Sequence, residues 1–154
     1  MKIARRAMAG TLAAATCWAM PAPADAGEVA PDLQVTAKPW TEYFVDNGPR
    51  GESPGDTFGF TEKLFQRGER VGRDAVECTI KRVTRQSFTM QCVGTLTLRG
   101  RGQITIQGAI TFSETSGDSF SLAVTGGTGE FRGVNGEMVV VERDGPDRYL
   151  LYFD

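Results

Sequence analysis

Hydrophobic and polar residues alternate with a period of two over most of the chain after residue 39. Clusters of Gly, Pro, Asp and Asn separate the alternating segments, and this combination is typical of β-strands joined by turns. No segment has a convincing helical period. The pattern therefore predicts strands over Trp40–Asp46, Thr57–Phe65, Val71–Arg82, Ser87–Leu98, Gln103–Phe112, Phe120–Thr125, Glu137–Arg143 and Arg148–Phe153.

One face of most predicted strands is apolar. In the second strand, strict alternation places Phe58, Phe60 and Leu64 on one side together with Glu62. Short loops between the strands favour an antiparallel meander, and closing it removes the exposed edges of an open sheet. We therefore predict an all-β fold, a closed eight-stranded antiparallel β-barrel with its apolar face inside. A barrel of this size is either filled by side chains or holds one small ligand.

The last two strands are apolar on both faces, over Val139–Val141 and Leu150–Tyr152. A second apolar face needs cover. Residues 27–39 contain two prolines and have no strong period, so we interpret them as a flexible leader. This leader can provide the cover. The cover can also come from another copy of the chain, which makes a homo-oligomer a second prediction.

The N-terminus has the three parts of a secretory signal peptide. Lys2, Arg5 and Arg6 precede an uncharged run over residues 7–20, and Ala24 and Ala26 offer a cleavage site. The apolar run is shorter than the roughly 20 residues that a membrane-spanning helix needs. We predict a signal peptide over residues 1–26, a leader over 27–39 and a barrel domain over 40–154. The mature protein is expected to be secreted or periplasmic without a membrane span, and the sequence does not separate the Sec from the Tat route.

Composition excludes several classes of function. The chain has no histidine, which excludes Ser-His-Asp and Cys-His catalytic machinery and most zinc sites. Its net charge is −2, and removal of residues 1–26 would make it more negative because that segment holds three basic residues and one acidic residue. No basic stripe is present, so we expect no nucleic-acid partner. Carboxylates, tyrosines, lysines or the shape of a pocket must provide any chemistry.

Two cysteines remain after the predicted cleavage. Cys78 and Cys92 lie symmetrically about Arg85 in two strands that would form a hairpin, so their side chains would be directly opposed. An even number of cysteines in an exported chain favours a disulfide. The alternative is a pair of free buried thiols.

Three segments resemble the allene oxide cyclase and dirigent superfamily of barrels. They are Gly55–Phe65 with the following Arg70-Val71-Gly72, Gln103–Gly108, and Ala123–Gly133, which contains a Gly-Gly-Thr-Gly-x-Phe-Arg motif. The resemblance extends over about Trp40 to Phe153. Exported bacterial members of this type carry a motif like Glu52–Asp56 and a cysteine pair. Bacterial spirotetronate Diels–Alderases have a similar second-strand hairpin and cyclise polyketides in the bore. The resemblance implies an apolar bore, no cofactor, and a dimer or trimer.

Catalytic residues of the plant cyclase transfer poorly to this chain. Glu62 stands where the resemblance places an asparagine that holds a catalytic water, and Ile110 stands where it places an active-site tyrosine. Phe60, Phe88 and Cys78 match positions in the pocket wall. The resemblance therefore implies the fold but not allene oxide cyclisation.

Glu62 is the candidate polar centre of the bore. Burial of its charge among apolar residues would be costly, so the group should be paired, hydrogen-bonded or protonated. Glu42 is the candidate second carboxylate, because Trp40, Glu42 and Phe44 repeat the pattern on the neighbouring strand. Two facing carboxylates would share one proton and form a candidate acid. The alternative places Glu62 near the barrel mouth, in contact with water or an arginine. The candidate ligand-binding residues are Trp40, Phe44, Phe58, Phe60, Phe88, Met90 and Ile110.

Two functions from different classes fit these observations. The first is an exported barrel that binds a small hydrophobic molecule in its bore, either non-catalytically or as a dirigent-like template. The second is a cyclase or isomerase without a cofactor, which would fold a polyunsaturated apolar substrate into one reactive conformer.

Overall fold

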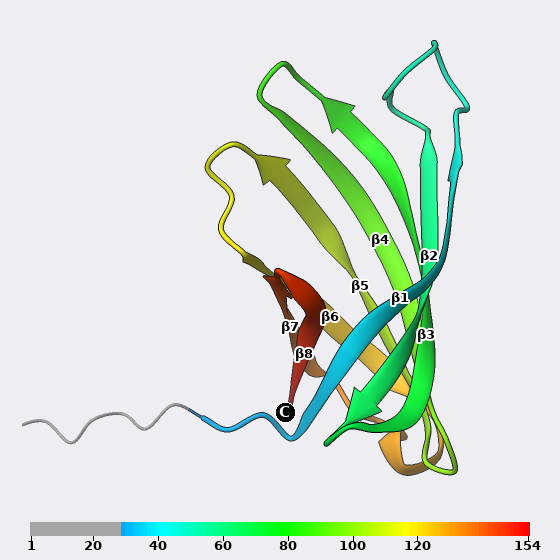
Figure 1. Ribbon diagram of the computed structural model, residues 1–154, viewed down its shortest axis with the longest axis vertical. Coiled ribbons are helices and arrows are strands. Elements are labelled where there is room, and N and C mark those ends of the chain that lie inside the picture. The colour runs from blue at the N-terminus through cyan, green and yellow to red at the C-terminus, as the bar shows by residue number, and fades with distance from the viewer. Residues whose placement is uncertain (1–28) are drawn as a thin grey trace, which may run out of the picture.

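The structure is a computed structural model that describes residues 29–154; the predicted signal peptide lies outside the described residues. Eight antiparallel strands form a closed barrel in which each strand pairs with its neighbours in chain order and the last pairs with the first (Figure 1). This confirms the predicted fold class. The strands are β1 (Leu33–Val45), β2 (Thr57–Gln66), β3 (Glu69–Val83), β4 (Ser87–Leu98), β5 (Gly102–Ser113), β6 (Ser119–Gly127), β7 (Gly136–Arg143) and β8 (Gly145–Phe153).

The first strand begins earlier than predicted. β1 starts at Leu33, and Leu33, Val35 and Ala37 are at most 4% exposed and contribute to the core. The expectation of a flexible leader over 27–39 is therefore wrong from residue 33 onward. Closure of the barrel depends on this segment, because Leu33–Ala37 is the part of β1 that pairs with β8. Pro39 concealed the strand, since proline occurs in sheets mainly at edges and bulges, and β1 has a bulge beside Pro39.

Large aliphatic side chains fill one end of the barrel. Leu64, Leu96, Ile104 and Leu151 are fully buried there, and Phe131 from the short 3₁₀ turn Gly129–Phe131 packs against the same core. Burial of each such side chain stabilises the fold by roughly 1.5–3 kcal/mol relative to exposure. The other end lacks this filling, which leaves room for a cavity.

The open end is wider because two strands separate there. β5 and β6 pair only between Ile104–Gln107 and Ala123–Gly127, so their remaining halves diverge toward the open end (Figure 1). Phe112 and Phe120 lie on the diverging halves and contact each other edge to face, with ring centroids 5.9 Å apart.

A disulfide joins Cys78 on β3 to Cys92 on β4, which are directly opposed in the register. This confirms the predicted pairing. Among the described residues, no helix has the length and hydropathy needed to span a membrane.

Candidate functional site

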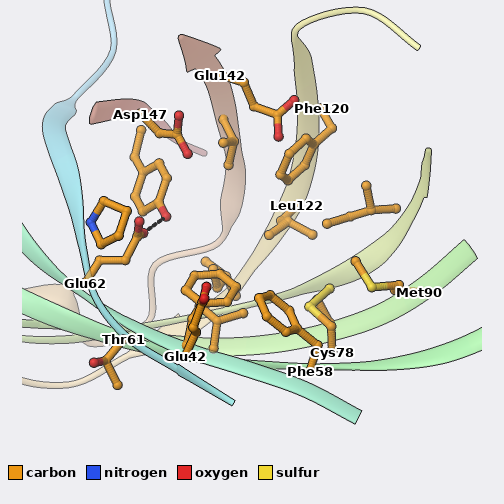
Figure 2. A pocket seen from close by; sticks show the side chains of 18 of the residues that line it. Glu42, Phe58, Thr61, Glu62, Cys78, Met90, Phe120, Leu122, Glu142 and Asp147 are labelled. Atoms are coloured by element: carbon orange, nitrogen blue, oxygen red, sulfur yellow. Dashed lines mark hydrogen bonds between the residues drawn. A yellow bond between two sulfur atoms is a disulfide. The ribbon is translucent and has the colours of Figure 1, made fainter. Parts of the chain in front are cut away.

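A cavity of about 520 Å³ occupies the open half of the barrel (Figure 2). Its two sides differ in chemistry. β3, β4, β5 and β6 contribute only apolar side chains and the disulfide to the lining, whereas the carboxylates come from β1, β2, β7 and β8, which are contiguous in the closed sheet. The apolar side consists of Val76, Cys78, Met90, Cys92, Ile106, Ile110, Phe112, Phe120 and Leu122.

Most of the predicted ligand-binding residues line this cavity. The lining includes Trp40, Phe58, Phe60, Met90 and Ile110. Phe44 and Phe88 are not part of it. Phe44 is 51% exposed on the last part of β1, and Phe88 stacks on the opposed Phe112 with ring centroids 5.2 Å apart, so that it lies beside the cavity wall on the same face of the sheet.

Glu62 is the buried acid of the cavity. It lies on β2 with 5% of its surface exposed, which contradicts the alternative that it reaches water at the mouth. The hydroxyl of Tyr149 on β8 donates a hydrogen bond to Glu62 Oε2, drawn as a dashed line in Figure 2. Both side chains line the cavity, so a bound molecule would meet a carboxyl and a phenol held together.

The carboxyl beside Glu62 belongs to Asp74, which the sequence analysis missed. Asp74 lies on β3 between the pairs Phe60–Val76 and Lys63–Arg73, at the position that faces Glu62, and is 1% exposed. Its Oδ1 accepts the backbone N–H of Glu62 at 2.8 Å, and its Oδ2 accepts no hydrogen bond from a donor among residues 29–154. A signal was present in the sequence, because Asp74 continues the alternation of Val76 and Cys78 and so belongs on the inner face.

Glu42 does not form the predicted carboxylate pair. It lines the cavity but is exposed, and it lies opposite Phe60, two residues nearer the open end along β2 than Glu62. The residue of β1 opposite Glu62 is Pro39, and the bulge at Trp40 follows directly. Glu42 was correctly assigned to the inner face but wrongly paired, because alternation gives the face of a strand but not its register.

Burial governs the ionisation of the acid cluster formed by Glu62, Asp74 and Tyr149. Removal from water, and after it the neighbouring Glu62 carboxylate, raise the pKa of Asp74 to about 8. Burial also raises the pKa of Glu62, although the hydrogen bond from Tyr149 opposes that shift. Burial raises the pKa of the Tyr149 hydroxyl, so it stays a hydrogen-bond donor. The cluster therefore retains a proton at neutral pH.

Two further carboxylates face the cavity nearer its mouth. Glu142 on β7 and Asp147 on β8 are both in the lining (Figure 2), and burial raises the pKa of each. No Lys or Arg is among the described residues that line the cavity. The polar side of the cavity is therefore acidic, with no cation to compensate for it.

The model of one protein family, the allene oxide cyclase barrel-like domain, matches residues 34–151. The chain belongs to this family. No curated protein matches it. Among solved structures, the allene oxide cyclase barrel-like chain is similar to a pyocyanin demethylase, with a TM-score of 0.69 and 28% identity over 79% of this chain and 98% of that one.

A second solved structure shares the fold. It is described as a nonspecific heme-binding cyclase that catalyses a [4 + 2] cycloaddition during neoabyssomicin biosynthesis. The TM-score is 0.52 and the identity 14%, and the match covers 78% of this chain and 59% of that one. The chain thus spans less than two thirds of that protein, and the likeness concerns the barrel alone.

Proposed function

We propose that the barrel binds one small, mostly apolar organic molecule in its bore and holds it against the Glu62–Tyr149 pair. The observation that carries this proposal is the difference in chemistry between the two sides of the cavity lining. An apolar wall on β3–β6 faces a wall that holds one buried hydrogen-bonded acid, and ligand pockets typically combine extensive apolar lining with a few placed polar groups.

The charges of the lining favour a neutral or cationic ligand. Glu42, Glu62, Glu142 and Asp147 all face the cavity without a compensating Lys or Arg among the described lining residues. A ligand carboxylate would be repelled there and would lose its hydration without replacement. A cation or a hydrogen-bond acceptor that takes the proton of the cluster would be stabilised. The stacked aromatic rings of Phe88 and Phe112 border the apolar wall and favour a conjugated ring system.

The solved relatives support a small organic molecule in the bore. A pyocyanin demethylase, at 28% identity over nearly its whole length, acts by its name on pyocyanin. This chain is proposed to share the type of ligand, a compact organic molecule, and not the demethylation.

A second candidate function is proton-transfer catalysis, as in a cyclase or isomerase without a cofactor. The specific observation in its favour is the proton that the Glu62–Asp74 pair retains at neutral pH in contact with the cavity. General acid catalysis requires a group of this kind within reach of the substrate. Binding alone requires less of the site and is the first proposal.

Export is part of the proposal. A disulfide within the barrel is typical of oxidising compartments, which agrees with a signal peptide over residues 1–26 and a secreted or periplasmic mature protein. N-terminal sequencing of the protein from its native host is expected to begin near residue 27. A mature chain that still begins at Met1 would contradict export by this route.

Three tricyclic probes of similar shape test the ligand proposal. 10-Methylacridinium is a cation, acridine is neutral at mildly alkaline pH, and anthracene-9-carboxylate is an anion. Fluorescence titration is expected to show binding of the cation and the neutral ring, with the anion at least about tenfold weaker. Ile110→Trp, which fills the apolar wall, should abolish binding of both, whereas Ala109→Trp on the outer face of β5 should not. Equal binding of all three probes, or none, would overturn the proposal.

A further inference from the structure

The barrel wall is irregular beside the acid cluster. Pairs between β2 and β3 run through Phe60–Val76 and resume at Lys63–Arg73, with no pair recorded for Thr61 or Glu62. On the other side of β2, strand β1 bulges at Trp40. Both ladders that flank β2 are therefore interrupted at the same height, which is where the buried acids lie.

The side chain of Asp74 occupies the interruption. Its Oδ1 accepts the Glu62 N–H that a neighbouring strand carbonyl would otherwise accept. Its Oδ2 is buried and accepts no hydrogen bond from a donor of the described residues, and Glu62 and Tyr149 are the side chains that interact with the Asp74 carboxyl. Buried polar atoms are almost always satisfied by the protein or by ordered water, so this oxygen either shares a proton with the Glu62 carboxyl or meets a water molecule.

A depression on the outside of the barrel lies beside Asp74. It has a volume of about 340 Å³, and Asp74 is part of its lining but not of the lining of the bore cavity. Trp40 and Thr61 line both spaces, so the two spaces approach the barrel wall at the same residues, beside Asp74. The rest of the outer lining is polar or small, with Arg73, Ala75, Thr95, Thr97 and Gln103.

We propose that Asp74 is the point at which protons pass between bulk water and the buried Glu62–Tyr149 pair, through the interruption between β2 and β3. Water in the outer depression gives a proton to Asp74 Oδ2, and the same carboxyl releases a proton to the Glu62 carboxylate that faces it. One proton enters and one leaves, so the charge of Asp74 is restored. The reverse sequence removes a proton from the cluster.

The ionisable groups around the interruption suit this role. Glu62 faces Asp74 from β2, Tyr149 and Asp147 lie on the β8 side, and Arg73 lines the outer depression. Burial raises the pKa of Asp74 to about 8, so the group changes protonation near neutral pH and can both accept and release a proton there.

The route matters when the bore is occupied. A ligand in the cavity separates Glu62 from water at the mouth, because Glu62 is 5% exposed and lies farther from the mouth than Glu142 and Asp147. Exchange through Asp74 keeps the buried acids in equilibrium with the solvent while the ligand remains bound. The role of this route during ligand binding rests on the proposed function. The route itself does not depend on it.

Infrared spectroscopy in D₂O tests the route directly. The C=O band of a buried protonated carboxyl shifts when COOH becomes COOD, so its rate of change after mixing measures proton access. With 10-methylacridinium in the bore, the wild-type band is expected to shift rapidly. Ala75→Leu fills the outer depression and should slow the shift by about tenfold or more. The matched control Ala109→Leu, at an exposed outward position on β5, should leave the rate unchanged.

Two further variants complete the test. Asp74→Asn keeps an acceptor for the Glu62 N–H but cannot relay a proton, so the remaining Glu62 band should shift slowly with the probe bound. Probe fluorescence reports binding separately, and if the probe does not bind, Met90→Trp fills the bore in its place and so closes the path from the mouth. Equal exchange rates in the wild type and Ala75→Leu with the mouth closed would overturn the route. Slow exchange in the closed wild type would place the route at the mouth and would also overturn it.

Discussion

Asp74 accepts the backbone N–H of Glu62 at 2.8 Å, so the residue that holds the β2 backbone in place also brings a second carboxyl against the first. The same contact therefore has a structural and an electrostatic effect. The electrostatic effect makes the stability of the barrel depend on pH.

We predict that the wild-type protein loses stability as the pH rises toward 8. The folded-state pKa of Asp74 is raised from 3.8 to about 8, so between these values the native state holds a proton that the unfolded chain releases. The free energy of unfolding should fall over this window by at most ~1.4 kcal/mol per pH unit. Asp74→Asn should flatten the dependence, measured by urea unfolding at several pH values. A wild-type profile that is flat or rises from pH 4 to 8 would contradict the prediction.

Glu62→Gln should keep or increase stability and change ligand binding. The amide is nearly isosteric, still accepts the Tyr149 hydrogen bond and removes a charge whose burial is costly. Probe affinity is expected to change most for the cation, which loses an opposite charge. Glu137→Gln, at an exposed position on β7, is the control and should leave both quantities unchanged. If Glu62→Gln binds every identified ligand like the wild type, Glu62 is not the centre of the site.

Tyr149→Phe should destabilise the barrel by about 1–3 kcal/mol, because it leaves Glu62 Oε2 buried without its donor. The loss of that hydrogen bond should also raise the pKa of Glu62 further, since the bond lowers it in the wild type. Chemical unfolding measures the first effect and infrared titration of the carboxyl band measures the second. Tyr152→Phe on the same strand removes a hydroxyl that makes no hydrogen bond within the part of the chain that the structure describes, and it should change neither.

Loss of the disulfide should lower stability without abolishing the fold. The bridge has a sequence separation of 14, for which the chain-entropy model gives about 3 kcal/mol as an upper value in a hairpin already held by its ladder. The double variant Cys78→Ala, Cys92→Ala should unfold at lower denaturant concentration than the wild type. Mass spectrometry of the purified wild type should find no free thiol at these positions, and two free thiols would contradict the bridge.

Self-association through β7 and β8 remains a prediction from the sequence. Val139 and Leu150 oppose each other on the outer face and are half-buried in the isolated chain. Light scattering is expected to show a dimer or trimer at roughly tens of micromolar. Leu150→Lys should reduce the mass to that of one chain, whereas Gln107→Lys on the outer face of β5 should not. A monomeric wild type would remove the interface.

The sequence predicted the barrel well because alternation is a strong local signal. The inner faces of β2 to β6 follow from period two alone, and the opposed cysteines follow from their equal distances to the turn. The early part of β1 was hidden because Pro31 and Pro39 flank its alternating residues. Its partner is β8, at the far end of the chain, and no local pattern reveals such a pairing.

The candidate site was predicted in part. Alternation placed Glu62 on the inner face, where it lies, but it could not give the register that brings Asp74 rather than Glu42 against it. Tyr149 was hidden for a different reason. β8 is apolar on both faces, so its pattern does not distinguish the residues that face the bore from those that face outward. The hydrogen bond to Glu62 emerges only when β8 closes the barrel.

The filled and hollow halves of the barrel have a consequence for the evolution of the family. One end of the barrel holds the buried core, which includes Leu64, Leu96 and Ile104. The other end holds the cavity, which is lined by residues such as Met90 and Phe120. Substitutions at the hollow end remove few contacts from the folding core. Ligand preference can therefore diverge rapidly among descendants that keep one scaffold, and the same separation makes the barrel a suitable starting point for engineered small-molecule receptors.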